Sequence, residues 1–233
     1  MLTLRPAHER GHFDHGWLDT HHTFSFGAYH DPRRMGFRTL RVINDDRVAP
    51  GQGFPMHGHR DMEIVTVVLE GELAHRDSLG HGATLTPGMV QRMSAGTGIR
   101  HSEFNPSPDR PLHLYQIWLT PERDGLPPSY EDRAFPPDVT ADRLGLLASR
   151  DGAEGSLVIH QDLRLYRADL SPRATAAHEL APGRAAWLQV LTGTVEVAGA
   201  TLAAGDGASL TDQGRIDLTG GREGGSVLLF DLA

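Results

Sequence analysis

The apolar residues of this 233-residue chain come in short runs, and Gly, Pro or Asp residues separate one run from the next. Short runs rich in branched and aromatic residues predict β-strands, and many of them in succession predict a sandwich or a barrel. A short helix is expected near residues 141–147. The predicted strands cover residues 37–44, 63–69, 112–119, 163–170, 187–191 and 226–232.

The pattern occurs twice along the chain. Val-Leu-Glu-Gly ending at Gly71 corresponds to Val-Leu-Thr-Gly ending at Gly193, and Ala-Thr-Leu precedes both Gly88 and Gly205. Each copy reads as strand, Gly turn, strand and second Gly turn, which indicates a duplicated unit. A Pro-rich, charged stretch at residues 120–137 looks like a linker. We therefore expect an all-β protein with two small β-barrels face to face, formed by residues 1–125 and 135–233.

Two short pairs of polar residues stand out within the first half. They are His57-Gly58-His59 and His101-Ser-Glu103, and each pair has its polar side chains two residues apart. Residues i and i+2 of a β-strand point to the same face, so each pair can aim two metal-binding groups at one point. Three imidazoles and one carboxylate suit a divalent transition metal such as iron, nickel, manganese or copper, and leave positions open for a small molecule.

Composition narrows the possible partners. The chain has no cysteine, so His and carboxylate groups are the metal ligands available to it. Its net charge of −8 argues against direct nucleic-acid binding. No run approaches the ~18 apolar residues of a membrane-spanning helix. The N-terminal MLTLRPAHERGHF lacks the apolar region of a secretory signal, so a cytoplasmic protein without membrane contact is expected.

The sequence around the two pairs resembles the pirin family of the cupin superfamily. The resemblance rests on GFPMHGHRDMEIVTVVLEG at 53–71, SAGTGIRHSEFN at 94–105 and HTFSFGAYHDPRRMGFRTLRVINDD at 22–46. The family includes bacterial pirin-like proteins associated with quercetin 2,3-dioxygenase activity. The resemblance implies a bicupin of jelly-roll type, with the segment before Phe37 packed across the second barrel. It also implies that His57, His59, His101 and Glu103 are the metal ligands.

The identity of the carboxylate ligand has an alternative. Many cupins carry a Glu a few residues after His-x-His, which here nominates Glu63. In a straight strand Glu63 would lie about 13 Å beyond His59, too far to share its metal. Glu103 shares strand register with His101 and matches the pirin pattern, so we favour Glu103. Glu63 is then expected to accept a hydrogen bond from a ligating imidazole or to pair with a charge in the core.

The second half shows no comparable ligand set. The positions that correspond to the four ligands are Glu179, Ala181, Leu218 and Gly220, with His178 nearby. We expect one metal per chain and a second barrel that serves structure, shielding or partner binding. Surface or hydrogen-bonding roles are expected for the remaining first-half histidines without a convergent partner, which are His8, His12, His15, His30, His75, His81 and His113.

The leading hypothesis is a metal-dependent dioxygenase that cleaves the ring of a flavonol such as quercetin with dioxygen. The resemblance supplies the substrate class, and Fe(II) is the first choice of metal, with Ni, Co, Mn and Cu as alternatives. Glu103 can double as the catalytic base for the substrate hydroxyl. A second hypothesis is a redox- or metabolite-sensing regulatory protein that acts through a protein partner. A third is a sugar isomerase, for which Arg60, Arg92 and Arg100 are the phosphate-binding candidates.

Overall fold

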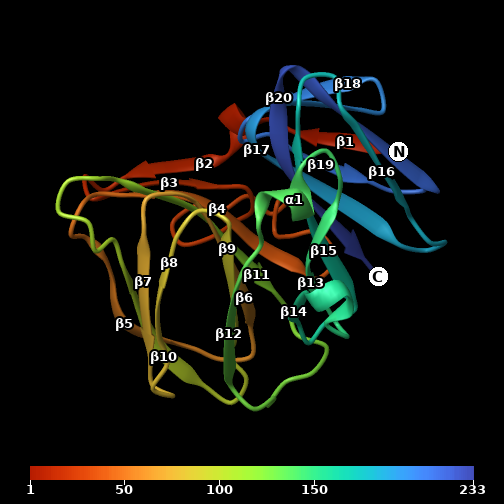
Figure 1. Ribbon diagram of the computed structural model, residues 1–233. Helices are drawn as coiled ribbons and strands as arrows, with labels where there is room; N and C mark the ends of the chain where they lie inside the picture. Colours follow the sequence, from red (N-terminus) through yellow and green to blue (C-terminus); the bar gives the residue numbers. More distant parts are fainter. The chain divides into compact units, whose positions relative to one another are not determined.

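The computed structural model describes residues 1–233, and nearly all regular structure in it is β (Figure 1). The chain forms two compact units. The C-terminal unit consists of Met1–Arg10, Phe135–Val158 and Asp162–Ala233, and the N-terminal unit consists of Gly11–Ala134 and Ile159–Gln161. None of the helices is long and apolar enough to span a membrane.

Two antiparallel sheets build the N-terminal unit. One has seven strands in the order β12-β9-β6-β11-β4-β3-β2, and the other has four in the order β5-β10-β7-β8. The strands of the larger sheet are β2 (Gly11–Asp14), β3 (Leu18–His22), β4 (Leu40–Val48), β6 (Glu63–Glu70), β9 (Met89–Ser94), β11 (Leu112–Leu119) and β12 (Ser129–Ala134). Those of the smaller sheet are β5 (Gly53–His59), β7 (Leu73–Asp77), β8 (Gly82–Leu85) and β10 (Ile99–Phe104).

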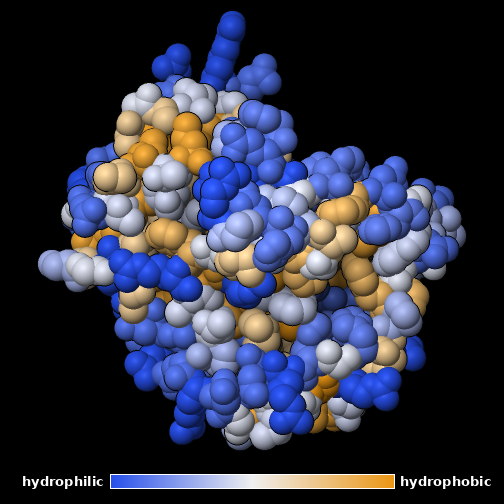
Figure 2. All heavy atoms as spheres, turned by 180° about the vertical axis from the view of Figure 1, so that it is seen from behind, coloured by the Kyte–Doolittle hydropathy of each residue, from blue (hydrophilic) through white to orange (hydrophobic).

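The apolar faces of these strands meet inside the unit. Along β11, Leu112 and Leu114 are buried together with Val48 of β4, while Leu73 and Leu85 come from the smaller sheet. Apolar residues from both sheets therefore share one cluster, as expected of two packed sheets. The face shown in Figure 2 is covered mostly by hydrophilic residues, with apolar residues visible in smaller groups between them.

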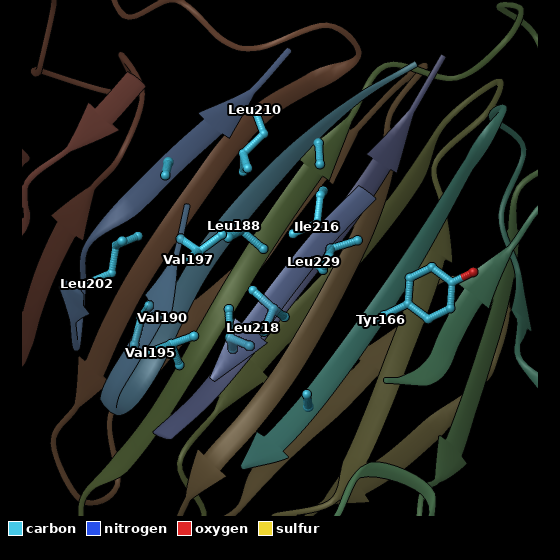
Figure 3. Packing of buried hydrophobic residues seen from close by; sticks show 14 of the residues in the cluster. Tyr166, Leu188, Val190, Val195, Val197, Leu202, Leu210, Ile216, Leu218 and Leu229 are labelled. Atoms are coloured by element: carbon cyan, nitrogen blue, oxygen red, sulfur yellow. The ribbon is translucent and has the colours of Figure 1, made fainter. Parts of the chain in front are cut away.

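The C-terminal unit is a nine-stranded sheet, in which β1-β19-β17-β20-β15-β13-β14 follow one another, β16 pairs with β20 and β18 pairs with β17. Side chains from neighbouring strands of this sheet form its main apolar cluster (Figure 3). The strands are β1 (Leu2–Arg5), β13 (Gly145–Ser149), β14 (Leu157–Val158), β15 (Leu163–Leu170), β16 (Thr175–Glu179), β17 (Ala185–Val197), β18 (Ala200–Ala203), β19 (Gly207–Leu210) and β20 (Arg215–Leu232).

The predicted strands at 112–119 and 163–170 are confirmed as β11 and β15. Those at 187–191 and 226–232 are the buried parts of the longer strands β17 and β20. Both strands continue beyond these apolar runs. They pass register shifts in the pairing of β17 with β20, and there the backbone pairing identifies them as strands. Apolar runs therefore identify the centre of each strand but underestimate its length.

The predicted helix near residues 141–147 is wrong. Helix α1 (Pro137–Thr140) has only four residues, and β13 follows it. All five residues of β13 are buried, and the strand pairs with β15 on one side and with β14 on the other. In a sheet, a buried segment this short can hydrogen-bond its backbone N–H and C=O groups to the neighbouring strands, whereas one isolated helical turn would leave most of them without partners.

The predicted linker at 120–137 also contains strand β12, which pairs with β9. Two further short segments are 3-10 helices, η1 (Ala7–Glu9) and η2 (Ala153–Gly155).

The sequence repeat corresponds to one turn geometry used twice. Gly71 has a φ of +76°, and a Cβ placed on it would lie 2.3 Å from the carbonyl oxygen of Pro111. Gly193 has a φ of +64°, and a Cβ there would lie 2.3 Å from the carbonyl oxygen of Gly224. Both positions combine left-handed backbone with close approach of a neighbouring strand, and Gly satisfies both requirements.

We predict that Gly71→Ala destabilises the protein more than Gly16→Ala does. Gly16 also has a positive φ of +79°, but a Cβ on it would meet nothing within 4 Å. Both substitutions incur the cost of a left-handed alanine, about 1–2 kcal/mol. Gly71→Ala adds a clash with backbone, which should lower the free energy of unfolding by about 1–3 kcal/mol more in urea titrations. Equal effects of the two variants would contradict this account of the turn.

An ionisable side chain is buried in the larger sheet. Asp46 of β4 is 4% exposed, and its Oδ1 accepts a hydrogen bond from the Thr20 hydroxyl. Burial raises the pKa of Asp46 to about 7, and the negative charges of Asp45 and Glu103 act in the same direction. The folded protein thus holds a proton that the unfolded chain releases at a much lower pH.

Asp46→Asn should therefore change how stability depends on pH. In the native protein the contribution of Asp46 is fully present below the ordinary pKa of 3.8 and is lost as pH rises towards about 7. The amide does not titrate. The free energy of unfolding of the variant, minus that of the native protein, should therefore be about 2–4 kcal/mol higher at pH 8 than at pH 3.5. Chemical denaturation at the two pH values measures this. A pH-independent difference would show that Asp46 ionises normally.

Candidate metal centre

Pairing of β5 with β10 brings three imidazoles together. In this antiparallel pair His57 lies opposite His101 and His59 lies opposite Ile99. The ring centroids of His57, His59 and His101 lie 4.5–4.9 Å apart, and one nitrogen from each ring falls within 4.8 Å of the others. The two-residue spacing of His57 and His59 and the cross-strand position of His101 together produce this convergence.

The nitrogens of these rings lie close together and can act as electron-pair donors to a cation. Nε2 of His59 lies 3.0 Å from Nε2 of His101. Burial and the neighbouring imidazoles lower the pKa of both rings to about 3, so both are neutral at physiological pH. His57 donates its Nδ1 proton to the carbonyl oxygen of Pro55 at 2.8 Å, which leaves its Nε2 as an acceptor. Fixing one ring nitrogen by a backbone carbonyl is the usual way to orient a metal ligand.

Glu103 lies beside this group but is held by other residues. A register shift between His101 and Glu103 sets Glu103 opposite Phe54. Its buried carboxylate accepts hydrogen bonds from Nε2 of Gln91 at 2.8 Å and Nε2 of Gln116 at 2.7 Å, one on each oxygen. The pKa of Glu103 is raised, because the effect of burial exceeds the lowering by nearby imidazoles and by these amides. Each carboxylate oxygen keeps a second lone pair, so the amides orient the group without using up its capacity to bind a cation.

Two aromatic residues orient the amides. Trp118 donates its indole N–H to Oε1 of Gln116 at 3.1 Å, and the Tyr130 hydroxyl donates to Oε1 of Gln91 at 3.3 Å. In both amides the oxygen is engaged by an aromatic donor, so the NH₂ group must face Glu103. Trp118 also contacts His59, with ring centroids 4.8 Å apart in an edge-to-face arrangement.

Sequence analysis missed His75. This residue is 1% exposed, and β7 places it opposite Glu103, with Asp77 opposite His101. A ligand atom of His75 lies within 4.8 Å of those of His101 and Glu103. The signal was present, because His75-Arg-Asp77 repeats the two-residue spacing of the ligand pairs on a predictable strand. Of the two roles expected for His75, the surface role does not apply, whereas the hydrogen-bonding role fits its Nε2, which lies 3.5 Å from Oδ2 of Asp77.

Glu63 occupies a different part of the N-terminal unit. Its buried carboxylate accepts hydrogen bonds from the Ser94 hydroxyl at 2.9 Å and from the backbone N–H of His160 at 3.2 Å. The His160 ring lies 3.5 Å from the same carboxylate. Glu63 is a member of none of the side-chain groups that could hold a metal ion. It therefore acts as a buried hydrogen-bond acceptor with the His160 ring beside it.

Other candidates are also engaged elsewhere. Arg92, a phosphate-binding candidate, donates to Ser129 at 2.6 Å and to Glu131 at 3.2 Å. In the C-terminal unit His178 pairs with Asp231 at 2.8 Å. All three side-chain groups that could hold a metal ion come from the N-terminal unit.

Comparisons with known proteins agree with this architecture. Residues 3–119 match the Pirin family model, and residues 146–232 match the quercetinase C-terminal cupin domain. The chain is 49% identical over 232 residues to quercetin 2,3-dioxygenase of Escherichia coli, covering 100% of this chain and 99% of that protein. A pirin-like protein of Caulobacter vibrioides is 40% identical over 235 residues, with full coverage of both chains.

A solved structure extends the likeness to three dimensions. The bacterial pirin YhhW of Escherichia coli in complex with nickel(II) is 49% identical, with a TM-score of 0.94 over 100% of this chain and 99% of that one. A second crystal structure of YhhW has a TM-score of 0.96 and 48% identity, covering 100% of this chain and 98% of that one. Sequence, family models and fold give one answer: this chain is a bicupin and belongs to the pirin family.

Proposed function

We propose that this protein is a metal-dependent dioxygenase that cleaves the ring of a flavonol such as quercetin. The observation that carries the proposal is the convergence of His57, His59 and His101, whose acceptor nitrogens face one point. Relatives that match the whole chain are named quercetin 2,3-dioxygenase, which supports the substrate class.

His57, His59, His101 and Glu103 would hold one divalent metal ion. Three imidazoles and a carboxylate accept iron, nickel, cobalt, manganese or copper, and Fe(II) is our first choice. The nickel complex of YhhW supports a divalent ion in this family. A bound ion would supply a Lewis acid that favours the ionised form of a coordinated substrate hydroxyl.

The surrounding residues of this chain would position the substrate and its proton. Glu103 would accept the proton of the flavonol hydroxyl, while Gln91 and Gln116 keep its carboxylate in a fixed orientation. Trp118 lies next to His59, and Phe54 lies 6.5 Å from His57 between ring centroids. Aromatic rings beside the imidazoles suit a flat aromatic substrate, because ring edges and faces attract one another.

Replacing a ligand should empty the site. We expect His57→Ala and His101→Ala to abolish stoichiometric metal in protein purified without added metal, and Glu103→Gln to weaken metal binding by at least about 10-fold. Glu63→Gln should leave the metal content unchanged, because Glu63 bonds to Ser94 and His160. Elemental analysis measures all four variants. Loss of metal in Glu63→Gln with retention in Glu103→Gln would reverse the choice of carboxylate.

Activity should depend on the N-terminal unit alone. Oxygen uptake with quercetin should follow the metal content of that site and vanish in His59→Ala. His178→Ala should stay active, since His178 bonds to Asp231 and belongs to none of the groups of side chains that could hold a metal ion. An oxygen electrode, with circular dichroism to check folding, measures both. Loss of activity in folded His178→Ala would show that the C-terminal unit takes part in catalysis. Full metal loading without oxygen uptake on any flavonol would favour the regulatory hypothesis instead.

A further inference from the structure

A second group of metal-binding side chains lies on the hairpin formed by β2 and β3. Strand β2 is the outermost strand of the seven-stranded sheet, and its partner β3 pairs with β4. His12 on β2 lies directly opposite His21 on β3, and Asp19 lies two residues before His21 on the same strand. The spacing therefore puts Asp19 and His21 on one face, beside His12.

The polar atoms of the three side chains lie at distances close to those between ligand atoms of one metal ion. Nε2 of His12 is 2.8 Å from Oδ1 of Asp19, and Nδ1 of His21 is 3.8 Å from the same oxygen. The two rings are 4.3 Å apart between centroids, with planes 14° from parallel. With metal–ligand bonds of about 2.0–2.1 Å, neighbouring ligand atoms stand about 3–3.4 Å apart. The lone pair of each imidazole nitrogen lies in the plane of its ring, so the two nearly parallel rings must tilt towards each other to bind one ion.

The exposure of this group differs from that of the imidazoles on β5 and β10. The side chains of His12 and Asp19 are 53% and 44% exposed, and that of His21 is 25% exposed. An ion can reach the exposed His12 and Asp19 from solvent and keep water on its remaining positions, whereas the Nδ1 atom of His21 is buried. Two imidazoles and one carboxylate are donors that Zn²⁺, Ni²⁺ and Cu²⁺ accept.

We propose that His12, Asp19 and His21 form a second, solvent-accessible binding site for a divalent transition metal such as Zn²⁺. This site does not depend on the proposed dioxygenase activity. An ion bound there would join the edge strand β2 to β3. Binding should therefore stabilise the folded protein as well as add one metal per chain.

Calorimetric titration of the nickel-loaded full chain with Zn²⁺ tests the proposal. The native protein should bind one Zn²⁺ per chain, with elemental analysis showing that nickel is retained. His12→Gln and Asp19→Asn each remove one ligand, so they should weaken Zn²⁺ binding by at least about 10-fold, the cost of losing even a supporting contact in other metal sites. Both side chains are about half exposed, so neither change threatens the fold.

Two controls separate this site from the rest of the molecule. His30→Gln removes an exposed imidazole that belongs to no metal-binding group, and it should leave Zn²⁺ binding unchanged. His59→Ala, which should abolish binding on β5 and β10, should still bind Zn²⁺ on the hairpin and be stabilised by it in thermal unfolding. No Zn²⁺ binding by the nickel-loaded native protein, or equal binding by His12→Gln and Asp19→Asn, would overturn the proposal.

Discussion

The candidate metal centre depends on the antiparallel pairing of β5 with β10. That pairing sets His101 opposite His57, and strand alternation brings His59 to the same face. A slip of one residue in this register would turn the imidazoles of one strand away from those of the other. On its other side β10 pairs regularly with β7, and this pairing sets Glu103 opposite His75. The two pairings of β10 thus decide which polar groups meet.

The larger sheet controls the orientation of the smaller sheet's carboxylate. Gln91 from β9 and Gln116 from β11 each donate to one oxygen of Glu103 on β10. Tyr130 and Trp118 in turn fix the two amides. A buried carboxylate would be costly without such partners, so this set of bonds both stabilises the interior and aligns the group for chemistry. The same connection ties the two sheets of the N-terminal unit together.

The two units share their turns but differ in their polar interiors. Gly71 and Gly193 keep the same left-handed turn against a neighbouring strand. Where the N-terminal unit has converging imidazoles, the C-terminal unit has His178 and Arg184 bonded to the carboxylate of Asp231. These two bonds satisfy the buried carboxylate of Asp231 with protein groups. The two units therefore share this turn geometry but differ in their buried polar side chains.

The sequence by itself determined the β class, the repeat and the strands with strong apolar patterns, because those properties depend on local alternation and turn residues. It also predicted a metal site at His57, His59, His101 and Glu103, from two-residue spacing within a strand, which is a local property, and from the resemblance to the pirin family. It misassigned 141–147 as helix and did not indicate that His75 is buried opposite Glu103. Only the tertiary structure decided these points and the amide contacts of Glu103, because strand pairing joins residues far apart in the chain, and no local pattern specifies which strands become neighbours.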